Sequence, residues 1–175
     1  MALKRVQEST GATFLMVTHD FAEALSLANR GAVLNQGVVE QAGDIDDIFL
    51  RPTSTFVADF VGMKNVFPAV FAGERTVVGG VEIRLGTRPG NNCGHIAIRP
   101  EDVKILVESP SEEGGNAFPG KVRGIVDQGF TYEVLVVVGD LTFRSLMTKK
   151  ALFKKDIREG NPVFVSFPSD AVHCF

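Results

Sequence analysis

The sequence predicts a mixed α/β segment followed by an all-β unit that is built around a small barrel. In the first third of the chain, the apolar run Phe14 to Val17 leads into an amphipathic helix. From Asn65 onward, short apolar runs alternate with turns that are rich in glycine and proline. Five such runs follow one another in the last third, which is typical of a small barrel. The change of pattern predicts two domains, residues 1–62 and 63–175.

The composition is that of a globular protein. The chain has 175 residues, of which 45% are hydrophobic, and its formal net charge is −3. This acidic balance argues against a general nucleic-acid-binding protein, because such a protein needs a basic patch to hold phosphates. No apolar run approaches the roughly 20 residues that cross a bilayer, and the N-terminus lacks a secretion signal. We therefore expect a cytoplasmic protein.

Two cysteines, Cys93 and Cys174, lie far apart in the sequence and show no zinc-binding spacing. In a reducing compartment, we expect them to be free thiols rather than a disulfide. No metal site is predicted.

The first candidate site is the polar triplet Thr18-His19-Asp20. It follows the predicted strand Phe14 to Val17 and precedes a helix whose apolar residues recur at the i, i+3, i+4 and i+7 positions. Asp20 or Thr18 can cap that helix by accepting from its free N–H groups. In α/β folds, ligands bind at the edge of the sheet where strands end. His19 is therefore the candidate functional residue of this half.

The other elements of residues 1–62 carry no predicted chemistry. The sequence favours a helix over 2–10 that ends at Gly11, because glycine suits the position after a helix. It then favours a hairpin over 31–43 with its turn at Gly37. Two short helices follow, one capped by Asp44 and one capped by Ser54 or Thr55.

Residues 63–175 are predicted to form strands joined by turns. The first strand candidates are 66–71, 76–78 and 81–85, followed by a strand, a proline turn and a second strand over 95–107. Those of the last third are 121–129, 132–138, 141–147, 163–167 and 171–175, with one helical turn over 150–153. Five short strands around such a turn favour a closed barrel of the oligonucleotide/oligosaccharide-binding (OB) type.

A set of residues between positions 18 and 62 matches a known family in order and spacing. They are Thr18-His19-Asp20, Glu23-Ala24, Ala28, Gly37, Gln41-Ala42-Gly43, Ile48, Pro52, Phe56-Val57-Ala58 and Phe60-Val61-Gly62. This segment resembles the last part of the ATP-binding subunit of ABC importers. The resemblance implies that His19 is the switch histidine, which hydrogen-bonds the γ-phosphate of ATP across a dimer. Residues 1–62 would then be an α/β remnant, the C-terminal part of an ABC ATPase domain.

The second half carries a resemblance of its own. The run Ile98-Arg99-Pro100-Glu101-Asp102-Val103 looks like the signature of the TOBE accessory domain that follows the ATPase in many importers. The segments 120–167 and Ala171-Val172-His173 resemble the molybdate-binding, Mop-like version of that domain. Residues 63–175 would then form an all-β, OB-like TOBE barrel.

The Mop-like resemblance implies a second candidate site. In that family, molybdate or tungstate lies between barrels and is held by backbone N–H groups and by small hydroxyl or lysine side chains. By position, the oxyanion-binding candidates are Thr148, Lys149, Ser166 and Ser169. The sequence departs from the family at Ala151, where a serine is common, and at Pro168, where a lysine is frequent. These departures predict a site that is weakened or lost.

Together the resemblances imply a partial ATP-binding subunit of an ABC importer for molybdate, tungstate or a related oxyanion, with a regulatory or dimerising barrel. The implied ligands are ATP, Mg²⁺ and the oxyanion. The implied partners are a permease, an external solute-binding protein and a second copy in a homodimer, at the inner face of the membrane.

The family is a transport ATPase, but three of its motifs do not occur in this sequence. These are the phosphate-binding glycine loop, the signature motif and the apolar run that ends in Asp-Glu. We therefore predict that the chain alone does not hydrolyse ATP. A piece of this kind would leave strand Phe14 to Val17 with unpaired edges.

Two other functions stay open at this point. One is a free-standing molybdate-binding barrel protein without ATPase activity. The other is a nucleic-acid-binding barrel, which is disfavoured because the late strands do not interleave basic and aromatic residues.

Overall fold

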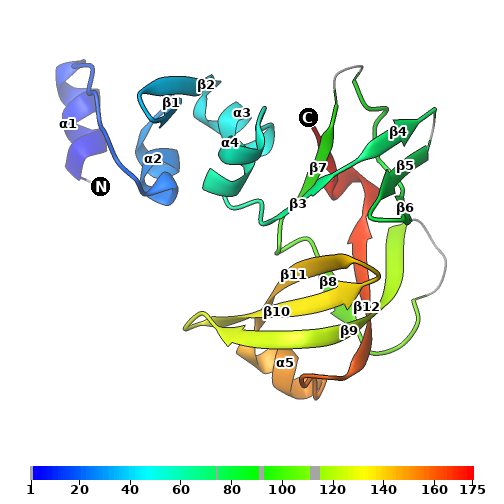
Figure 1. Cartoon of the computed structure of the whole chain (residues 1–175). Coiled ribbons are helices and arrows are strands. Elements are labelled where there is room, and N and C mark those ends of the chain that lie inside the picture. The colour runs from blue at the N-terminus through cyan, green and yellow to red at the C-terminus, as the bar shows by residue number, and fades with distance from the viewer. Residues whose placement is uncertain (1, 74, 91–92, 111–114) are drawn as a thin grey trace. The chain divides into compact units, whose positions relative to one another are not determined.

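The computed structural model describes residues 2–73, 75–90, 93–110 and 115–175 (Figure 1). The chain divides into two compact units, Met1–Val61 and Gly62–Phe175. We call them the N-terminal unit and the C-terminal unit and describe each by itself.

The N-terminal unit consists of short helices and one hairpin. Its elements are α1 (Ala2–Thr10), α2 (Phe21–Leu27), β1 (Arg30–Asn35), β2 (Val38–Asp44), α3 (Ile45–Leu50) and α4 (Thr55–Phe60). Strands β1 and β2 pair antiparallel, and their turn places Gln36 and Gly37 at positive φ, which glycine adopts without strain. The buried apolar side chains are few: Val33, Ile45, Ile48, Val57, Ala58 and Val61.

The helix caps of this unit largely follow the sequence prediction. The side chain of Asp20 accepts a hydrogen bond from the Glu23 N–H at the start of α2, and that of Ser54 accepts from the Val57 N–H at the start of α4. Asp44 lies at the cap position of α3, but its side chain makes no capping hydrogen bond.

The predicted strand at Phe14–Val17 is wrong: this segment is not a β-strand. In the part of the chain that the structure describes, no strand pairs with it. A β-strand is defined by its ladder of hydrogen bonds to a neighbour, so an extended segment without a neighbour does not become one. The prediction identified the strand-forming sequence but assumed a partner.

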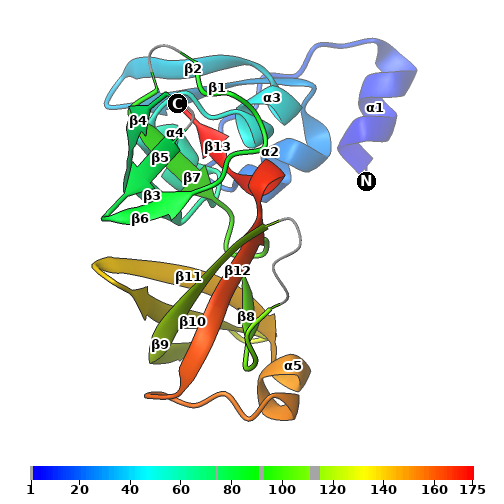
Figure 2. The ribbon, with the colours of Figure 1, turned by 90° about the vertical axis from the view of Figure 1, so that its right-hand side faces the viewer.

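The C-terminal unit contains three sheets. Its elements are β3 (Asn65–Pro68), β4 (Val70–Ala72), β5 (Arg75–Val78), β6 (Val81–Ile83), β7 (His95–Ile98), β8 (Lys104–Leu106), β9 (Gly115–Asp127), β10 (Thr131–Val138), β11 (Leu141–Thr148), α5 (Lys149–Lys154), β12 (Pro162–Pro168), the 3₁₀ turn η1 (Ser169–Ala171) and β13 (His173–Cys174). The largest sheet has the strand order β11-β10-β9-β12-β8 and is curled, with α5 at one end (Figure 2). The smaller sheets have the orders β13-β7-β3 and β4-β5-β6.

The composition of the five-stranded sheet corrects one prediction. The expected fifth strand, 171–175, lies in another sheet, where His173 pairs with Ala97 and Cys174 with Ile96 of β7. The fifth strand is β8 instead, which pairs with β12. The reason is local: Pro168 ends β12, and η1 then turns the chain away from the large sheet. The expected strand 66–71 is likewise divided, into β3 and β4.

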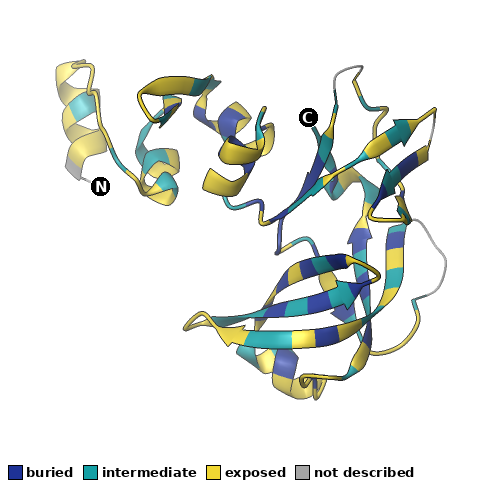
Figure 3. Ribbon diagram, in the orientation of Figure 1, coloured by how far each residue is buried: buried dark blue, intermediate teal, exposed yellow. Residues whose placement is uncertain are grey.

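The core of the C-terminal unit is one cluster of buried side chains from the large sheet and from β5, β6 and β7. Alternate residues of β10 and β11 are buried, as the period of two in a strand requires (Figure 3). Phe143 and Phe167 are the largest fully buried side chains, and their rings lie 5.6 Å apart. Cys93 and Cys174 are free thiols.

Both outer strands of this sheet have hydrogen-bonding groups covered by other segments. Along β11, the Asn65 side chain accepts from the Arg144 N–H at 2.6 Å and donates to the Arg144 carbonyl at 3.0 Å. The Leu146 N–H donates to the Pro100 carbonyl at 2.9 Å. Along β8, Lys155 Nζ donates to the Ile105 carbonyl at 2.7 Å. Covered edges do not offer a template for further pairing.

Candidate functional site

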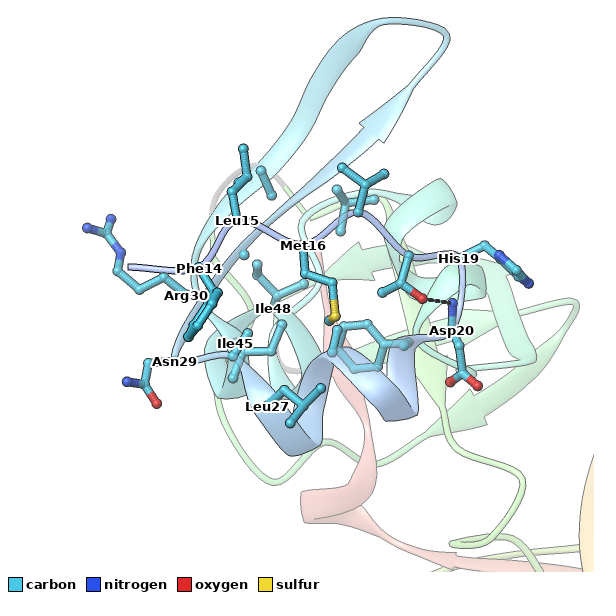
Figure 4. Close-up of a pocket in the computed structure, with 18 of the residues that line it drawn as sticks. Phe14, Leu15, Met16, His19, Asp20, Leu27, Asn29, Arg30, Ile45 and Ile48 are labelled. Carbon is cyan, nitrogen blue, oxygen red and sulfur yellow. Dashed lines mark hydrogen bonds between the residues drawn. The ribbon is translucent and has the colours of Figure 1, made fainter. Parts of the chain in front are cut away.

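His19 lies in a turn that is fixed by hydrogen bonds on both of its sides. The Thr18 hydroxyl donates to Glu23 Oε2 at 2.8 Å. It also accepts a hydrogen bond of 3.0 Å from the Asp20 N–H, which is the dashed line in Figure 4. Asp20 Oδ1 accepts from the Glu23 N–H at 3.1 Å. These bonds join the residues before and after His19 to the first turn of α2, so the backbone of the turn is held while the imidazole is not.

The imidazole of His19 is exposed and points away from the pocket that is drawn in Figure 4. A neutral imidazole offers one donor and one acceptor, and an imidazolium offers two donors. His19 could therefore donate to a phosphate oxygen. Its neighbours Asp20 and Glu23 are carboxylates, however, which repel an anion. The sequence placed His19 at the end of a strand; the structure places it at the end of an extended segment without strand pairing.

Thr148 and Lys149 lie together at one end of the five-stranded sheet, where β11 enters α5. The Thr148 hydroxyl accepts from the Ala151 N–H at 3.2 Å and so caps this helix. Lys149 Nζ lies 2.9 Å from Asp127 Oδ2 and 5.1 Å from the centre of the Tyr132 ring. The hydrogen bond between Lys149 and Asp127 raises the pKa of the lysine and lowers the pKa of the carboxyl group. Both candidates therefore already have partners on the protein.

Ser166 and Ser169 lie at the other end of the sheet. Ser166 of β12 pairs with Ala117 of β9 and with Lys104 of β8. Ser169 begins η1, and its carbonyl accepts from the Gly86 N–H at 2.7 Å. Both side chains are half-buried.

The four oxyanion candidates therefore form two pairs rather than one cluster. The first pair lies beside Asp127 and the second beside Ala117 of the same strand, β9. At roughly 3.3 Å per residue, the ten steps between these two positions follow about 33 Å of strand, and less where the strand bulges. The two pairs therefore lie at different ends of β9.

The two departures from the family pattern lie next to these pairs. Ala151 donates its N–H to Thr148 and packs against the core. Pro168 is the last residue of β12 and directly precedes Ser169. Neither side chain offers a hydrogen-bonding group, so any anion here would depend on the hydroxyls, Lys149 and backbone N–H groups.

Sequence reasoning missed the residues that brace these positions. Asp127 and Tyr132 hold Lys149, and the only sequence signal was that both flank the turn at Gly129. The hydrogen bonds between the Asn65 side chain and the backbone of Arg144 left no signal in the sequence, because the two residues are 79 positions apart.

The motif at residues 98–103 turns out to be a structural turn. Arg99 is 9% exposed, and burial lowers the pKa of its guanidinium while Glu101 and Asp102 oppose that shift. Burial is also the main reason that the pKa of the Asp102 carboxyl is raised. The Asp102 N–H donates to the Arg99 carbonyl at 3.1 Å and closes the turn.

Two further properties concern the described residues only. Within the described ranges, no group of three or more His, Cys, Asp or Glu side chains is placed to hold a metal ion. None of the helices in the described segments has the length and apolar character needed to cross a membrane.

Comparison with known proteins identifies relatives of the whole chain and of its second half. Residues 96–175 match the TOBE domain family. The molybdate/tungstate import ATP-binding protein of Pyrococcus horikoshii is 35% identical over 173 residues, which are 99% of this chain and 50% of that protein. The spermidine/putrescine import ATP-binding protein of Clostridium acetobutylicum is 34% identical over 176 residues, 99% of this chain and 47% of that protein. The chain thus spans about half the length of these relatives.

Among solved structures, the cytoplasmic molybdate-binding protein ModG with molybdate bound superposes with a TM-score of 0.52 at 16% identity. The superposition covers 64% of this chain and 95% of that one, and it shows a common fold. The chain is therefore similar along almost its entire length to import ATP-binding proteins, and its residues 96–175 match the TOBE domain family.

Proposed function

We propose that this chain serves as the switch-histidine and TOBE part of the ATP-binding subunit of an importer for molybdate, tungstate or a related oxyanion. The observation that carries the proposal is the match over 99% of the chain to the Pyrococcus horikoshii molybdate/tungstate protein. The exposed position of His19 supports it, because a sensor of the γ-phosphate must be reachable from outside its own domain.

The candidate side chains favour an oxyanion over the polyamines named for the clostridial relative. Thr148, Ser166 and Ser169 are neutral hydroxyls and Lys149 is a cation, which suits a dianion and not a polycation. Because the two pairs lie at opposite ends of β9, we propose that the oxyanion binds between two barrels, in a homodimer or larger assembly. The barrel would then couple oxyanion binding to assembly.

Nucleotide chemistry would need more than this chain. His19 offers a phosphate at most two donors, and the carboxylates of Asp20 and Glu23 lie next to it. We propose that the chain alone neither holds ATP and Mg²⁺ nor hydrolyses ATP. In the transporter, a permease at the inner face of the membrane and an external solute-binding protein would be its partners.

A second candidate function is a free-standing oxyanion-binding protein. Two observations favour it. The C-terminal unit has its own core and covered sheet edges, and 64% of the chain shares a fold with a molybdate-binding protein. In this case, the N-terminal unit would have no part in the activity.

Calorimetric titration separates these possibilities. We expect heat of binding with molybdate and tungstate, a weaker response to sulfate and none to spermidine. Ser166→Ala should reduce the affinity for molybdate at least tenfold, whereas Ser26→Ala, a serine of α2 in the N-terminal unit, should not. Absence of heat at millimolar oxyanion would refute the oxyanion proposal. A second titration uses ATP and Mg²⁺. If the chain binds them and His19→Ala abolishes that binding, the proposal that the chain alone does not hold ATP is refuted.

A further inference from the structure

The carboxylate of Asp127 is held in place by the turn in which it lies, and not only by Lys149. Its Oδ1 accepts a hydrogen bond of 2.7 Å from the Gly129 N–H. The Gln128 N–H donates to the Thr131 carbonyl at 2.9 Å and closes the same turn between β9 and β10. The second carboxylate oxygen, Oδ2, therefore accepts from Lys149 Nζ at a position that the turn fixes.

This carboxylate carries its negative charge at neutral pH. The hydrogen bonds from Lys149 and Gly129 hold the pKa of Asp127 below its ordinary value. Asp127 thus gives Lys149 a counter-ion at 2.9 Å, and the side chains of this ion pair are 40% exposed for the lysine and 51% for the aspartate. An ion pair that is exposed to this extent is weak. An incoming anion can therefore share Lys149 with Asp127, but it meets a negative charge there.

Thr148 and Lys149 keep hydrogen-bond donors that an anion could use. An ammonium carries three N–H donors, and the described residues accept one of those of Lys149. The Thr148 oxygen accepts from the Ala151 N–H, which leaves the proton of its hydroxyl for a further acceptor. Two hydrogen bonds of about 2.8 Å from one ammonium nitrogen, at its tetrahedral angle, place their acceptors about 4.6 Å apart. An anion on Lys149 would then lie next to the Asp127 carboxylate.

We propose that Asp127 sets the charge preference of the Thr148–Lys149 pair: it offsets the charge of Lys149 and weakens the binding of a dianion more than that of a monoanion of the same shape. The proposal rests on the proposed function, in which this pair contacts the oxyanion. The repulsion between two charges is proportional to each of them. A dianion such as molybdate or tungstate therefore meets twice the repulsion that a monoanion meets. The factor by which Asp127 lowers the affinity for a dianion is then the square of the factor for a monoanion.

The simpler role of Asp127 is to hold the turn alone. Its hydrogen bond to the N–H two residues further on is that of an Asx turn, which asparagine forms as well. Asp127→Asn therefore keeps the turn and removes only the charge. A purely structural role predicts no change in anion binding. A distorted turn predicts the same change for any two anions of one shape, so the comparison of two such anions isolates the charge.

The test is calorimetric titration of the intact chain with tungstate, a dianion, and with perrhenate, a tetrahedral monoanion of similar size. At an ionic strength of about 0.01 M, the Debye length is about 30 Å, so the charges are little screened. Asp127→Asn should strengthen the binding of tungstate about tenfold and that of perrhenate about threefold. At an ionic strength of about 1 M, where the Debye length is about 3 Å, the gain for tungstate should fall below about twofold.

The matched control is Asp140→Asn. It removes the same charge from an exposed turn at the other end of β10 and β11, far from Thr148. It should change the affinity for either anion by less than about twofold, because a charge at that distance acts weakly in water.

The outcomes separate this proposal from the oxyanion proposal. A larger gain for tungstate than for perrhenate, seen with Asp127→Asn and not with Asp140→Asn, supports the role of Asp127. If the unsubstituted chain binds tungstate but the gains are absent, equal for the two anions or shared by Asp140→Asn, the role of Asp127 is overturned while the oxyanion proposal stands. Binding of tungstate by Asp127→Asn alone supports the role of Asp127 and refutes oxyanion binding by the unsubstituted chain. No binding by any of the three chains overturns both proposals.

Discussion

In the C-terminal unit, Asn65 and Pro100 cover the outer edge of β11, whereas Phe14–Val17 in the N-terminal unit has no partner among the described residues. The apolar side chains differ in the same way. Phe143 and Phe167 are fully buried, while Leu15 and Val17 are almost fully exposed. The apolar side chains of the C-terminal unit thus pack within the unit itself, whereas part of the apolar surface of the N-terminal unit stays solvated.

The largest expected effect is on the closed core. Phe143→Ala should destabilise the C-terminal unit by about 3–5 kcal/mol, because it removes a fully buried ring and leaves a cavity. Unfolding in guanidinium chloride, followed by the fluorescence of Tyr132, measures it, since Tyr132 is the one tyrosine of a chain that has no tryptophan. Val70→Ala, at an exposed position of the same unit, should change the stability by less than about 0.5 kcal/mol. Equal shifts would contradict the closed core.

The next effect concerns the covered edge. Asn65→Ala leaves the N–H and C=O of Arg144 without their side-chain partner, and each unsatisfied buried group costs about 1–3 kcal/mol. We expect a loss of about 3 kcal/mol by the same measurement. Asn35→Ala in the N-terminal unit removes one half-buried hydrogen bond to Glu40 and should cost about 1 kcal/mol, read from hydrogen exchange along β1. If Asn65→Ala costs no more than Asn35→Ala, the edge is not held as described.

Thiol chemistry compares the two units directly. Burial raises the pKa of the Cys174 thiol to about 11, because the thiolate is the charged form and loses hydration. At pH 8 its thiolate fraction is then about a hundredfold below that of a thiol with the ordinary value of about 9. Iodoacetamide should therefore modify Cys174 about a hundredfold more slowly than a cysteine introduced by Leu15→Cys, measured by peptide mass spectrometry.

The pH dependence of that reaction has a defined sign. Since the pKa of Cys174 is raised in the folded state, the neutral thiol stabilises the fold fully below the unfolded pKa of about 9. This contribution is lost as the pH rises from about 9 through about 11, and the modification rate should rise over the same interval. A Cys174 rate equal to that of Leu15→Cys at pH 8 would contradict a closed C-terminal unit.

The smallest effect is at the His19 turn. Asp20→Ala removes the cap of α2 and should cost about 1 kcal/mol, which corresponds to roughly fivefold faster hydrogen exchange at the Glu23 amide. Asp20→Ser keeps an oxygen acceptor and should exchange nearly as the unsubstituted chain does. The same rate for the two variants would show that the cap does not hold the turn.

The elements that sequence predicted well are those decided by local chemistry. Asp20 and Ser54 cap their helices, and Gly79 and Gly80 form a turn with positive φ at both residues between the predicted strands 76–78 and 81–85. Strand 141–147 is also confirmed, and its alternate residues Leu141, Phe143 and Ser145 are buried. Capping, turn geometry and the period of two depend only on residues close in the chain.

The predictions that failed depend on distant partners. Phe14–Val17 has the composition of a strand but no neighbour, and residues 171–175 have the composition of a strand but join β7 rather than β12. The four oxyanion candidates stay a prediction made from a family pattern, and their separation along β9 follows from the register of β9, β10 and β12. No local signal encodes which strand a segment will pair with.

Hydrogen exchange of the intact chain tests the central difference between the units most directly. In the absence of any partner, the amides of residues 14–17 should exchange at the rate of an unstructured peptide, while those of Val134 and Val136 in β10 should be protected by several orders of magnitude. Protection of residues 14–17 comparable to that of β10 would mean that this segment is hydrogen-bonded to another part of the chain, and it would contradict the difference between the two units.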